Sequence, residues 1–135
     1  MDKLPFKIEI VPGSPAYEQV IAAVHRAIAS GLISEGDSFL SVRALSKAAQ
    51  INPNTAHKVV QALVQEGTLE VLPGRGTRIA QPQRRGAAER HTIIEKSLES
   101  LIIEAKRVGF SKTELKDAIQ ATWEKLIESK NTHEK

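Results

Sequence analysis

The sequence predicts a mainly α-helical fold with a small β wing. An N-terminal winged helix-turn-helix over residues 1–80 is expected to precede a C-terminal two-helix dimerisation hairpin. Two helical patterns meet across a short turn near residue 51, two β-prone runs around a Pro/Gly turn follow them, and two longer helical patterns come last. Helices joined by so short a turn form a helix-turn-helix, and a hairpin directly behind the second helix forms its wing.

The composition argues against several functional classes. The chain has 135 residues and no cysteine, which excludes disulfides and thiolate metal sites. Its four histidines lack metal-ligand spacing, and no serine lies in a Gly-x-Ser-x-Gly turn, so we expect no metal, no cofactor and no enzyme activity. The N-terminal residues lack the apolar core of a signal peptide, and no apolar run approaches the length of a membrane span. These features predict a cytoplasmic protein.

The first elements lead into the helix pair. Alternation over residues 6–13 predicts a short extended arm. A helix is expected over residues 14–31, followed by a turn over residues 34–37. A second, short helix is expected over residues 41–50, where the side chain of Ser41 can cap the first turn. The buried stripe of the first helix consists of Tyr17, Val20, Ile21, Val24 and Ile28.

The stretch over residues 51–67 predicts a helix with marked ends. Asn52 is a good N-cap because its side-chain oxygen can accept from an N–H that lacks a helical partner. Pro53 follows at the first helical position, and Gly67 supplies a left-handed stop. One side is apolar and the other carries amide, imidazole and ammonium groups, which suit base edges and phosphates. An ordinary solvated helix face would look the same. The apolar side comprises Ala56, Val59, Val60, Leu63 and Val64, and the polar side comprises Asn54, His57, Lys58 and Gln61.

A hairpin is predicted directly behind this helix. Two β-prone runs, over residues 68–72 and 77–80, flank a Pro/Gly turn. Arg75 stands at the tip between Gly74 and Gly76. The glycines allow a close approach to a nucleic-acid backbone, and the arginine suits a phosphate or the minor groove. A Gly-Arg-Gly turn alone is weak evidence, but this one falls where a wing is expected.

The net charge is only +3, but the basic residues are unevenly distributed. Residues 38–65 contain arginine and lysine and no acidic residue, and residues 73–90 are also strongly basic. Residues 91–135 hold as many acids as bases. If the two basic segments share one surface, that surface is an electrostatic footprint for nucleic acid. A protein-binding face would normally mix both signs.

The C-terminal part of the chain predicts a dimerisation domain over residues 88–130. It follows a linker over residues 81–87 and precedes a disordered tail over residues 131–135. Apolar residues in its first helix follow the four-three spacing of a coiled-coil seam, and Ser111 and Glu114 form a capping box for its second helix. The surplus apolar surface argues for pairing with a second copy; the alternative is packing on the N-terminal domain. The predicted interface comprises Ile94, Leu98, Leu101, Ile102, Ala105, Val108, Leu115, Ile119, Trp123 and Leu126.

These features together resemble the GntR family of transcription regulators. The matching motifs lie between residues 15 and 79, and their order and spacing are specific. The resemblance implies that the start of the second helix, the polar side of the third helix and the wing tip lie at the DNA. Leu40 stands where the family usually has proline, and His57 stands where it usually has arginine. The motifs are Pro15-Ala16-Tyr17-Glu18-Gln19-Val20, Ile28-Ala29-Ser30-Gly31, Gly36-Asp37, Ser41-Val42-Arg43, Asn52-Pro53-Asn54-Thr55, Leu63-x-x-Glu66-Gly67 and Gly74-Arg75-Gly76-Thr77.

The short two-helix tail resembles the YtrA-like subfamily, in which it serves dimerisation and no large ligand-binding domain follows. This resemblance implies an autoregulated repressor, often of a transporter operon. We therefore expect a homodimeric repressor that binds a palindromic double-stranded DNA operator; the sequence identifies no small-molecule effector. The alternative is a winged-helix protein-interaction module without specific DNA binding. The candidate DNA-binding residues are Ser41, Arg43, Asn52, Asn54, Thr55, His57, Lys58, Gln61, Gly74, Arg75, Gly76 and Thr77.

Overall fold

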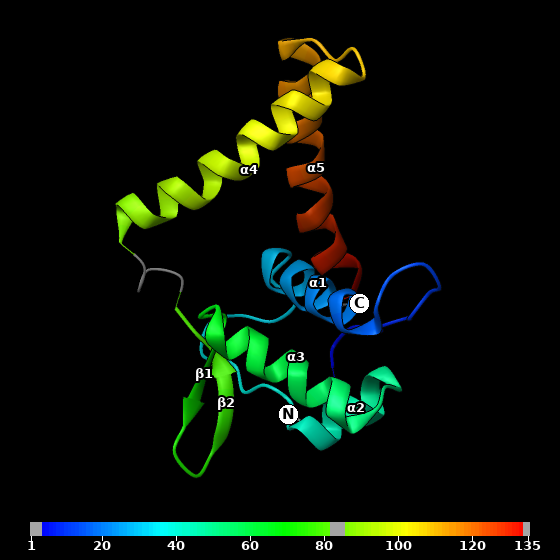
Figure 1. The fold of residues 1–135 in the computed structure, drawn as a ribbon, viewed down its shortest axis with the longest axis vertical. Helices are drawn as coiled ribbons and strands as arrows, with labels where there is room; N and C mark the ends of the chain where they lie inside the picture. Colours follow the sequence, from blue (N-terminus) through cyan, green and yellow to red (C-terminus); the bar gives the residue numbers. More distant parts are fainter. Residues whose placement is uncertain (1–3, 82–85, 134–135) are drawn as a thin grey trace. The chain divides into compact units, whose positions relative to one another are not determined.

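The computed structural model describes residues 4–81 and 86–133, and it confirms the predicted fold class. The chain divides into two units, one made of Met1–Gln81 with Ile127–Lys135 and the other of Pro82–Leu126. Three short helices and a two-stranded antiparallel sheet come first among the described residues, and two long helices follow (Figure 1). In chain order the elements are α1 (Ala16–Ala29), α2 (Val42–Ala49), α3 (Pro53–Gln65), β1 (Leu69–Leu72), β2 (Gly76–Ile79), α4 (Ala87–Arg107) and α5 (Lys112–His133).

Local side-chain chemistry sets the starts of α2 and α3. The Ser41 hydroxyl accepts a hydrogen bond from the Ala44 N–H at 3.1 Å. The Asn52 side-chain oxygen accepts from the Asn54 N–H at 2.8 Å. Both predicted N-caps are therefore confirmed. Pro53 occupies the first position of α3, where its missing N–H removes no helical hydrogen bond.

A single hydrophobic core holds α1, α2, α3 and the hairpin together. Both α1 and α2 pack against α3, which also contacts β1. Leu40 is only 1% exposed and belongs to this core, so apolar burial holds the segment that leads into α2 without the proline that is usual in the resembling family. The core cluster consists of Val20, Val24, Ala27, Ile33, Phe39, Leu40, Leu45, Ala49, Ala56, Val59, Leu63, Leu69 and Ile79.

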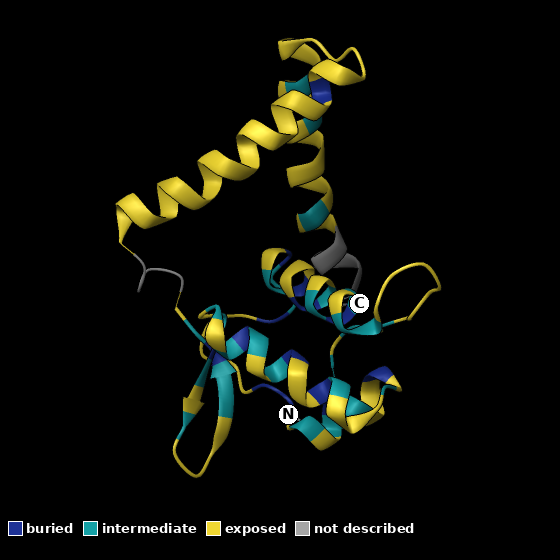
Figure 2. Ribbon diagram, viewed as in Figure 1, coloured by how far each residue is buried: buried dark blue, intermediate teal, exposed yellow. Residues whose placement is uncertain are grey.

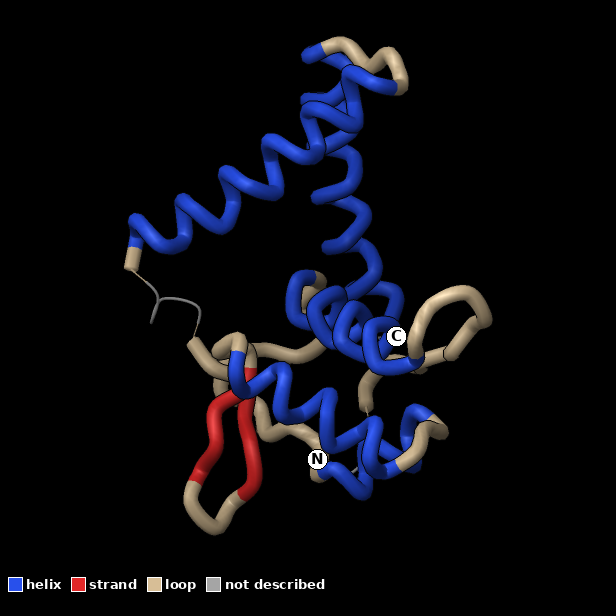
Figure 3. The backbone as a smooth tube through the Cα atoms, in the orientation of Figure 1, coloured by secondary structure: helices blue, strands red, loops and turns tan. Residues whose placement is uncertain are grey.

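The wing is an antiparallel hairpin whose second strand has a partner on each side. β1 and β2 pair along their whole length (Figure 3). On its other edge β2 meets residues 36–39: the Gly36 N–H donates to the Ile79 carbonyl at 2.9 Å, and the Phe39 N–H donates to the Thr77 carbonyl at 2.9 Å. The sequence predicted only a turn before this segment. These bonds attach the wing to the residues that lead into α2.

The N-terminal segment packs on the core without joining a sheet. The extended arm expected over residues 6–13 therefore gains no strand partner among the described residues. Phe6 and Ile8 are half-buried against the core. The Gln19 side chain takes the place of a neighbouring strand: its oxygen accepts from the Val11 N–H at 2.9 Å and its nitrogen donates to the Val11 carbonyl at 2.7 Å.

The unit that contains α4 has well-formed helix ends but almost no buried side chain. The predicted capping box is confirmed, because the Ser111 hydroxyl accepts from the Glu114 N–H at 3.1 Å and the Glu114 carboxylate accepts from the Ser111 N–H at 3.2 Å. Within the described residues 86–126, Ala105 is the only buried residue (Figure 2). Local hydrogen bonds therefore define the helices of this unit, and tertiary burial within the chain contributes little to them.

The boundaries of the C-terminal helices differ in part from those expected. Most of the linker predicted over residues 81–87 lies outside the described residues, and α4 already begins at Ala87. Helix α5 continues to His133, which corrects the disordered tail predicted over residues 131–135 as far as that residue; residues 134–135 lie outside the described part. The reason is that no proline or glycine follows Lys130 to stop the helix.

Candidate nucleic-acid interface

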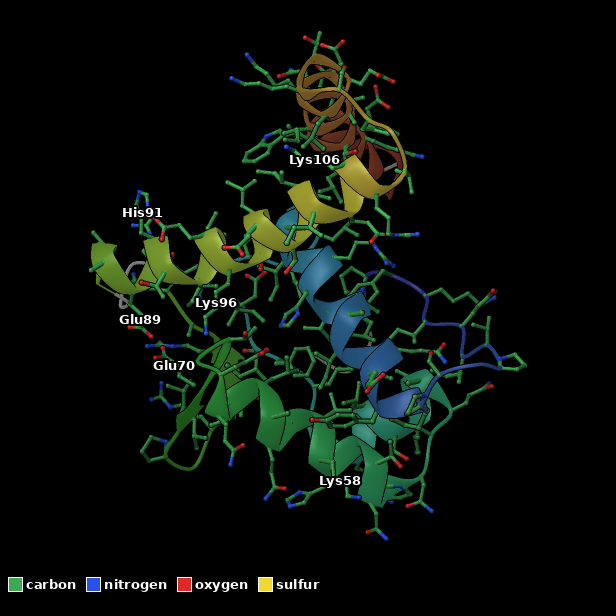
Figure 4. The ribbon with its side chains drawn as sticks, turned by 45° about the horizontal axis from the view of Figure 1, so that its top comes forward. Lys58, Glu70, Glu89, His91, Lys96 and Lys106 are labelled. Atoms are coloured by element: carbon green, nitrogen blue, oxygen red, sulfur yellow. The ribbon has the colours of Figure 1, made fainter. Side chains whose placement is uncertain are left out.

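Helix α3 separates its apolar and polar side chains onto opposite sides. Ala56, Val59 and Leu63 are fully buried in the core. Lys58 lies on the side of α3 that faces away from α1 (Figure 4). That side carries no acidic residue, so it presents hydrogen-bonding groups and positive charge to a partner. The exposed polar residues of α3 are Asn54, His57, Lys58 and Gln61, and Thr55 is half-buried among them.

Both cap residues retain a hydrogen-bonding group for a ligand. Asn52 uses its amide oxygen as the cap, which leaves its NH₂ group as a donor. Ser41 accepts a bond from the backbone and can still donate its hydroxyl proton. Both residues are exposed. Each can therefore position a helix end and bind a phosphate oxygen at the same time.

Helix α2 adds positive charge beside α3. Arg43 lies in the first turn of α2 and Lys47 in its last turn, and both are exposed. Neither residue forms an ion pair within the part of the chain that the structure describes. Their charges are therefore available to a negatively charged partner.

The wing tip carries a third group of candidate residues. Gly74 and Gly76 have φ angles of 70° and 84°, a left-handed conformation that glycine adopts without strain. Between them, the Arg75 N–H donates to the Leu72 carbonyl at 3.0 Å and closes the turn. The Arg75 side chain is exposed and forms no ion pair with any described residue. Thr77 is half-buried on β2, so it is the least accessible candidate of the wing.

A second arginine of the wing is neutralised by a neighbour, which the sequence analysis missed. Arg78 lies directly opposite Glu70 in the hairpin, and its Nε donates to the Glu70 carboxylate at 2.5 Å. Arg75 is therefore the wing arginine whose charge remains available. The signal was present in the sequence, because a hairpin centred on Gly74 places positions 70 and 78 opposite each other.

A polar cluster ties the C-terminal end of α3 to α1. The His25 Nε2 and Glu66 Oε1 atoms lie 2.5 Å apart, and the Thr68 hydroxyl donates to the same carboxylate oxygen at 2.9 Å. This cluster was also missed, because His25 and Glu66 are 41 positions apart in the chain and no local pattern connects them. The Glu66 carboxylate is thus bound within the protein, and these bonds stabilise the end of α3 that lies nearer the wing.

The predicted dimer residues fall into two classes. Ala105 is buried and Leu115 and Leu126 are half-buried within the single chain. The other predicted residues are exposed, with Ile94 at 64% and Trp123 at 69%. Exposed apolar side chains of this number along two helices are typical of a surface that a partner covers. The exposed members are Ile94, Leu98, Leu101, Ile102, Val108, Ile119 and Trp123.

The described residues contain neither a metal-binding cluster nor a helix suited to span a membrane. No group of three or more His, Asp or Glu side chains among them is placed to hold a metal ion. No described helix combines the length and the apolarity that a membrane span requires. Outside the candidate site, the Glu104 carboxylate raises the pKa of Arg107 in the last turn of α4.

The sequence of this chain is similar to those of bacterial regulatory proteins. The family model for bacterial regulatory proteins of the gntR family matches residues 16–79, which run from α1 to β2. The HTH-type transcriptional repressor YtrA of Bacillus subtilis (strain 168) is 36% identical over 116 residues, which cover 84% of this chain and 89% of that protein.

Solved structures share the fold over nearly the whole chain. A transcriptional antiterminator from Listeria monocytogenes EGD-e superimposes with a TM-score of 0.75 at 24% identity, covering 90% of this chain and 92% of that one. YtrA from Sulfolobus acidocaldarius, described as a GntR-family transcription factor, superimposes with a TM-score of 0.55 at 25% identity, covering 89% of this chain and 97% of that one. The similarity therefore extends beyond the winged helix-turn-helix into the C-terminal helices.

Proposed function

The chain belongs to the gntR family of bacterial regulatory proteins, and we propose that it is a homodimeric repressor that binds a palindromic DNA operator. One observation carries the proposal: the exposed side of α3 is free of acid and bears amide, imidazole and ammonium groups. The similar protein from Bacillus subtilis is named a transcriptional repressor, which supports repression as the outcome of binding. A repressor acts where the chromosome is, so we place the protein in the cytoplasm.

In this proposal α3 enters the major groove and reads base edges. Asn54 and Gln61 carry amides, which can bond bidentately to adenine, and Lys58 can bond to guanine or to a phosphate. The rigid support comes from the opposite side of the helix, where Val59 and Leu63 are fully buried. A side chain that recognises base edges must be held by a rigid backbone, and the burial of Val59 and Leu63 provides this rigidity.

The phosphate contacts come from both sides of α3. The helix α2 lies beside one end of α3 and the wing beside the other (Figure 1). At the α2 end, Ser41 and Arg43 can bind phosphates. At the wing end, Arg75 can bind the DNA backbone or the minor groove. Such contacts orient the protein on the duplex without selecting a sequence.

The second copy is bound through α4 and α5. Long apolar side chains on both helices stay exposed in the single chain, among them Leu98 at 42%, Leu101 at 45% and Ile119 at 44%. A two-fold pair would cover these residues and would align two α3 helices with the half-sites of an inverted repeat. From the YtrA-like resemblance we extend the proposal to an operator in front of a transporter operon.

The salt dependence of DNA binding tests the proposal. The logarithm of affinity should fall with the logarithm of salt concentration by about 0.9 for each phosphate neutralised. Arg75→Ala should flatten that slope, whereas Asn54→Ala should keep the slope and reduce discrimination between operator and unrelated DNA. Arg26→Ala, which removes an exposed arginine from α1, is the matched control and should leave both unchanged. Binding that ignores salt, or that neither Arg75→Ala nor Asn54→Ala alters, would favour a protein-interaction module instead.

A further inference from the structure

Gln50 has a backbone conformation that side chains rarely adopt. Its φ and ψ angles are 54° and 50°, and it is the only residue other than glycine with a positive φ in the described parts of the chain. Gln50 ends α2 and lies in the turn between α2 and α3. The other helix ends show what is usual: the left-handed residues after α1, α3 and α4 are Gly31, Gly67 and Gly109, with φ angles of 81°, 85° and 86°. Gln50 therefore occupies a position that glycine fills at the ends of α1, α3 and α4.

The surrounding turn imposes this conformation on Gln50. The Gln50 N–H donates to the Lys47 carbonyl at 3.4 Å, and the Ile51 N–H donates to the Ser46 carbonyl at 3.1 Å. The Ser46 hydroxyl returns a bond to the Ile51 carbonyl at 2.6 Å. These bonds form a left-handed helix stop for which glycine is the favoured residue. A strained non-glycine residue persists only where neighbours over-determine it, and such residues gather at functional sites.

The side chain of Gln50 belongs neither to the hydrophobic core nor to the hydrogen bonds of the described residues. Gln50 is exposed, and its carboxamide forms no hydrogen bond with any residue that the structure describes. Packing and internal hydrogen bonding therefore do not explain why a side chain occupies this position. The amide does stand within the acid-free span of residues 38–65, two positions before the N-cap Asn52. An uncommitted carboxamide can donate to a phosphate oxygen or pair with a base edge.

We infer that Gln50 is a further DNA-contacting residue, whose carboxamide hydrogen-bonds the operator beside the start of α3. The inference rests on the proposed function, because it requires that α3 lies on DNA. It also explains why glycine is absent: the contact needs a side chain at a position where the backbone favours none. In either case the carboxamide donates a hydrogen bond to DNA, and the acceptor belongs to a phosphate or to a base edge.

Two substitutions separate the contact from the strain. Gln50→Gly removes the side chain and relieves the backbone, so the melting temperature should rise by about 4 °C, while the dissociation constant for operator DNA should increase by about 3–10-fold. Gln50→Glu keeps the strain and the size but replaces the donor with a negative charge, so it should weaken binding at least as much as Gln50→Gly without the gain in melting temperature. Gln65→Glu, at the other end of α3, is the matched control for the added charge.

The measurement uses the full-length protein and a duplex that the wild type selects from a random DNA pool, with an unrelated duplex beside it. A loss confined to the selected duplex assigns the contact to a base, and an equal loss on both duplexes assigns it to a phosphate. A Gln50→Gly protein that is more stable and binds as tightly as wild type would overturn the inference, as would a Gln50→Glu effect no larger than that of Gln65→Glu. In either case wild-type binding would leave the proposed function intact; a wild type that selects no DNA would refute the proposed function itself.

Discussion

The segment from α1 to β2 and the helices α4 and α5 use apolar residues in opposite ways. In the first region Val20, Leu45 and Leu63 are fully buried. In the second region Ile94 and Trp123 remain 64% and 69% exposed, and only Ala105 is buried within residues 86–126. Both regions nevertheless begin helices with side-chain caps of the same kind. Local signals therefore form the helices of both regions, but only the first region has a hydrophobic core of its own, and the second leaves most of its apolar side chains exposed in the single chain.

Removal of α4 and α5 should have the largest effect. A chain that ends at Gln81 keeps the whole hydrophobic cluster, which lies between Val20 and Ile79, so it should stay folded. It should be monomeric and bind a single half-site. Its operator affinity should be lower by orders of magnitude, because two linked DNA-binding regions no longer bind the two half-sites together. Circular dichroism, sedimentation and operator titration would check this. A truncated chain that still dimerises would contradict the assignment of the interface to α4 and α5.

Alanine substitutions of one leucine in each region should affect different properties of the protein. Leu63→Ala leaves a cavity in a close-packed core and should lower the free energy of unfolding by about 2–5 kcal/mol. Leu98 is 42% exposed in the single chain, so Leu98→Ala should change the unfolding of the N-terminal region by no more than about 0.5 kcal/mol and should raise the dimer dissociation constant instead. Urea unfolding and sedimentation equilibrium measure the two quantities. Equal effects of both substitutions on unfolding would mean that the two regions share one core.

The helix caps should show the same contrast on a smaller scale. Asn52→Ala removes the acceptor for the Asn54 N–H and should destabilise the N-terminal region by about 1 kcal/mol. Ser111→Ala removes the matching bond to the Glu114 N–H and should act on the helical content of the C-terminal region and on dimerisation, not on the N-terminal transition. Thermal unfolding followed in the full chain and in the chain that ends at Gln81 separates the two. The idea fails if Ser111→Ala shifts the transition of the N-terminal region as far as Asn52→Ala does.

The smallest expected effect concerns the charge at position 57. Arginine carries a permanent positive charge and a planar fork of N–H donors that matches a phosphate. His57→Arg should therefore tighten DNA binding and steepen the salt dependence by about 0.9 for each added phosphate contact. His57→Gln adds no charge and is the control, so its salt dependence should be no steeper than that of the wild type. An identical slope for all three proteins would place residue 57 away from phosphates.

Sequence reasoning succeeded where the determining chemistry is local. The caps at Ser41, Asn52 and Ser111 were predictable because a cap acts on an N–H only two or three positions away. The bond between His25 and Glu66 was not predictable, because it joins residues 41 positions apart and depends on how α1 crosses α3. The same holds for the contact of residues 36–39 with β2, which needs tertiary packing to bring the two segments together.

Within the candidate site the same division applies. The exposed side of α3 followed from helical spacing alone, since the buried residues Ala56, Val59 and Leu63 fix which side faces outward. The neutralised charge of Arg78 required the strand register as well as the composition. The conformation of Gln50 could not be predicted, because glycine is the residue that sequence rules expect at such a stop.

Sequencing of the genomic DNA fragments that the purified full-length protein retains would show whether the protein binds a two-fold symmetric operator. A homodimer that reads DNA through α3 predicts that the enriched fragments share an inverted repeat, with half-sites about 34 Å apart, one helical turn, or a multiple of that spacing. Fragments without a common sequence, or with a single unrepeated element, would contradict the account of two recognition helices brought to the operator by α4 and α5.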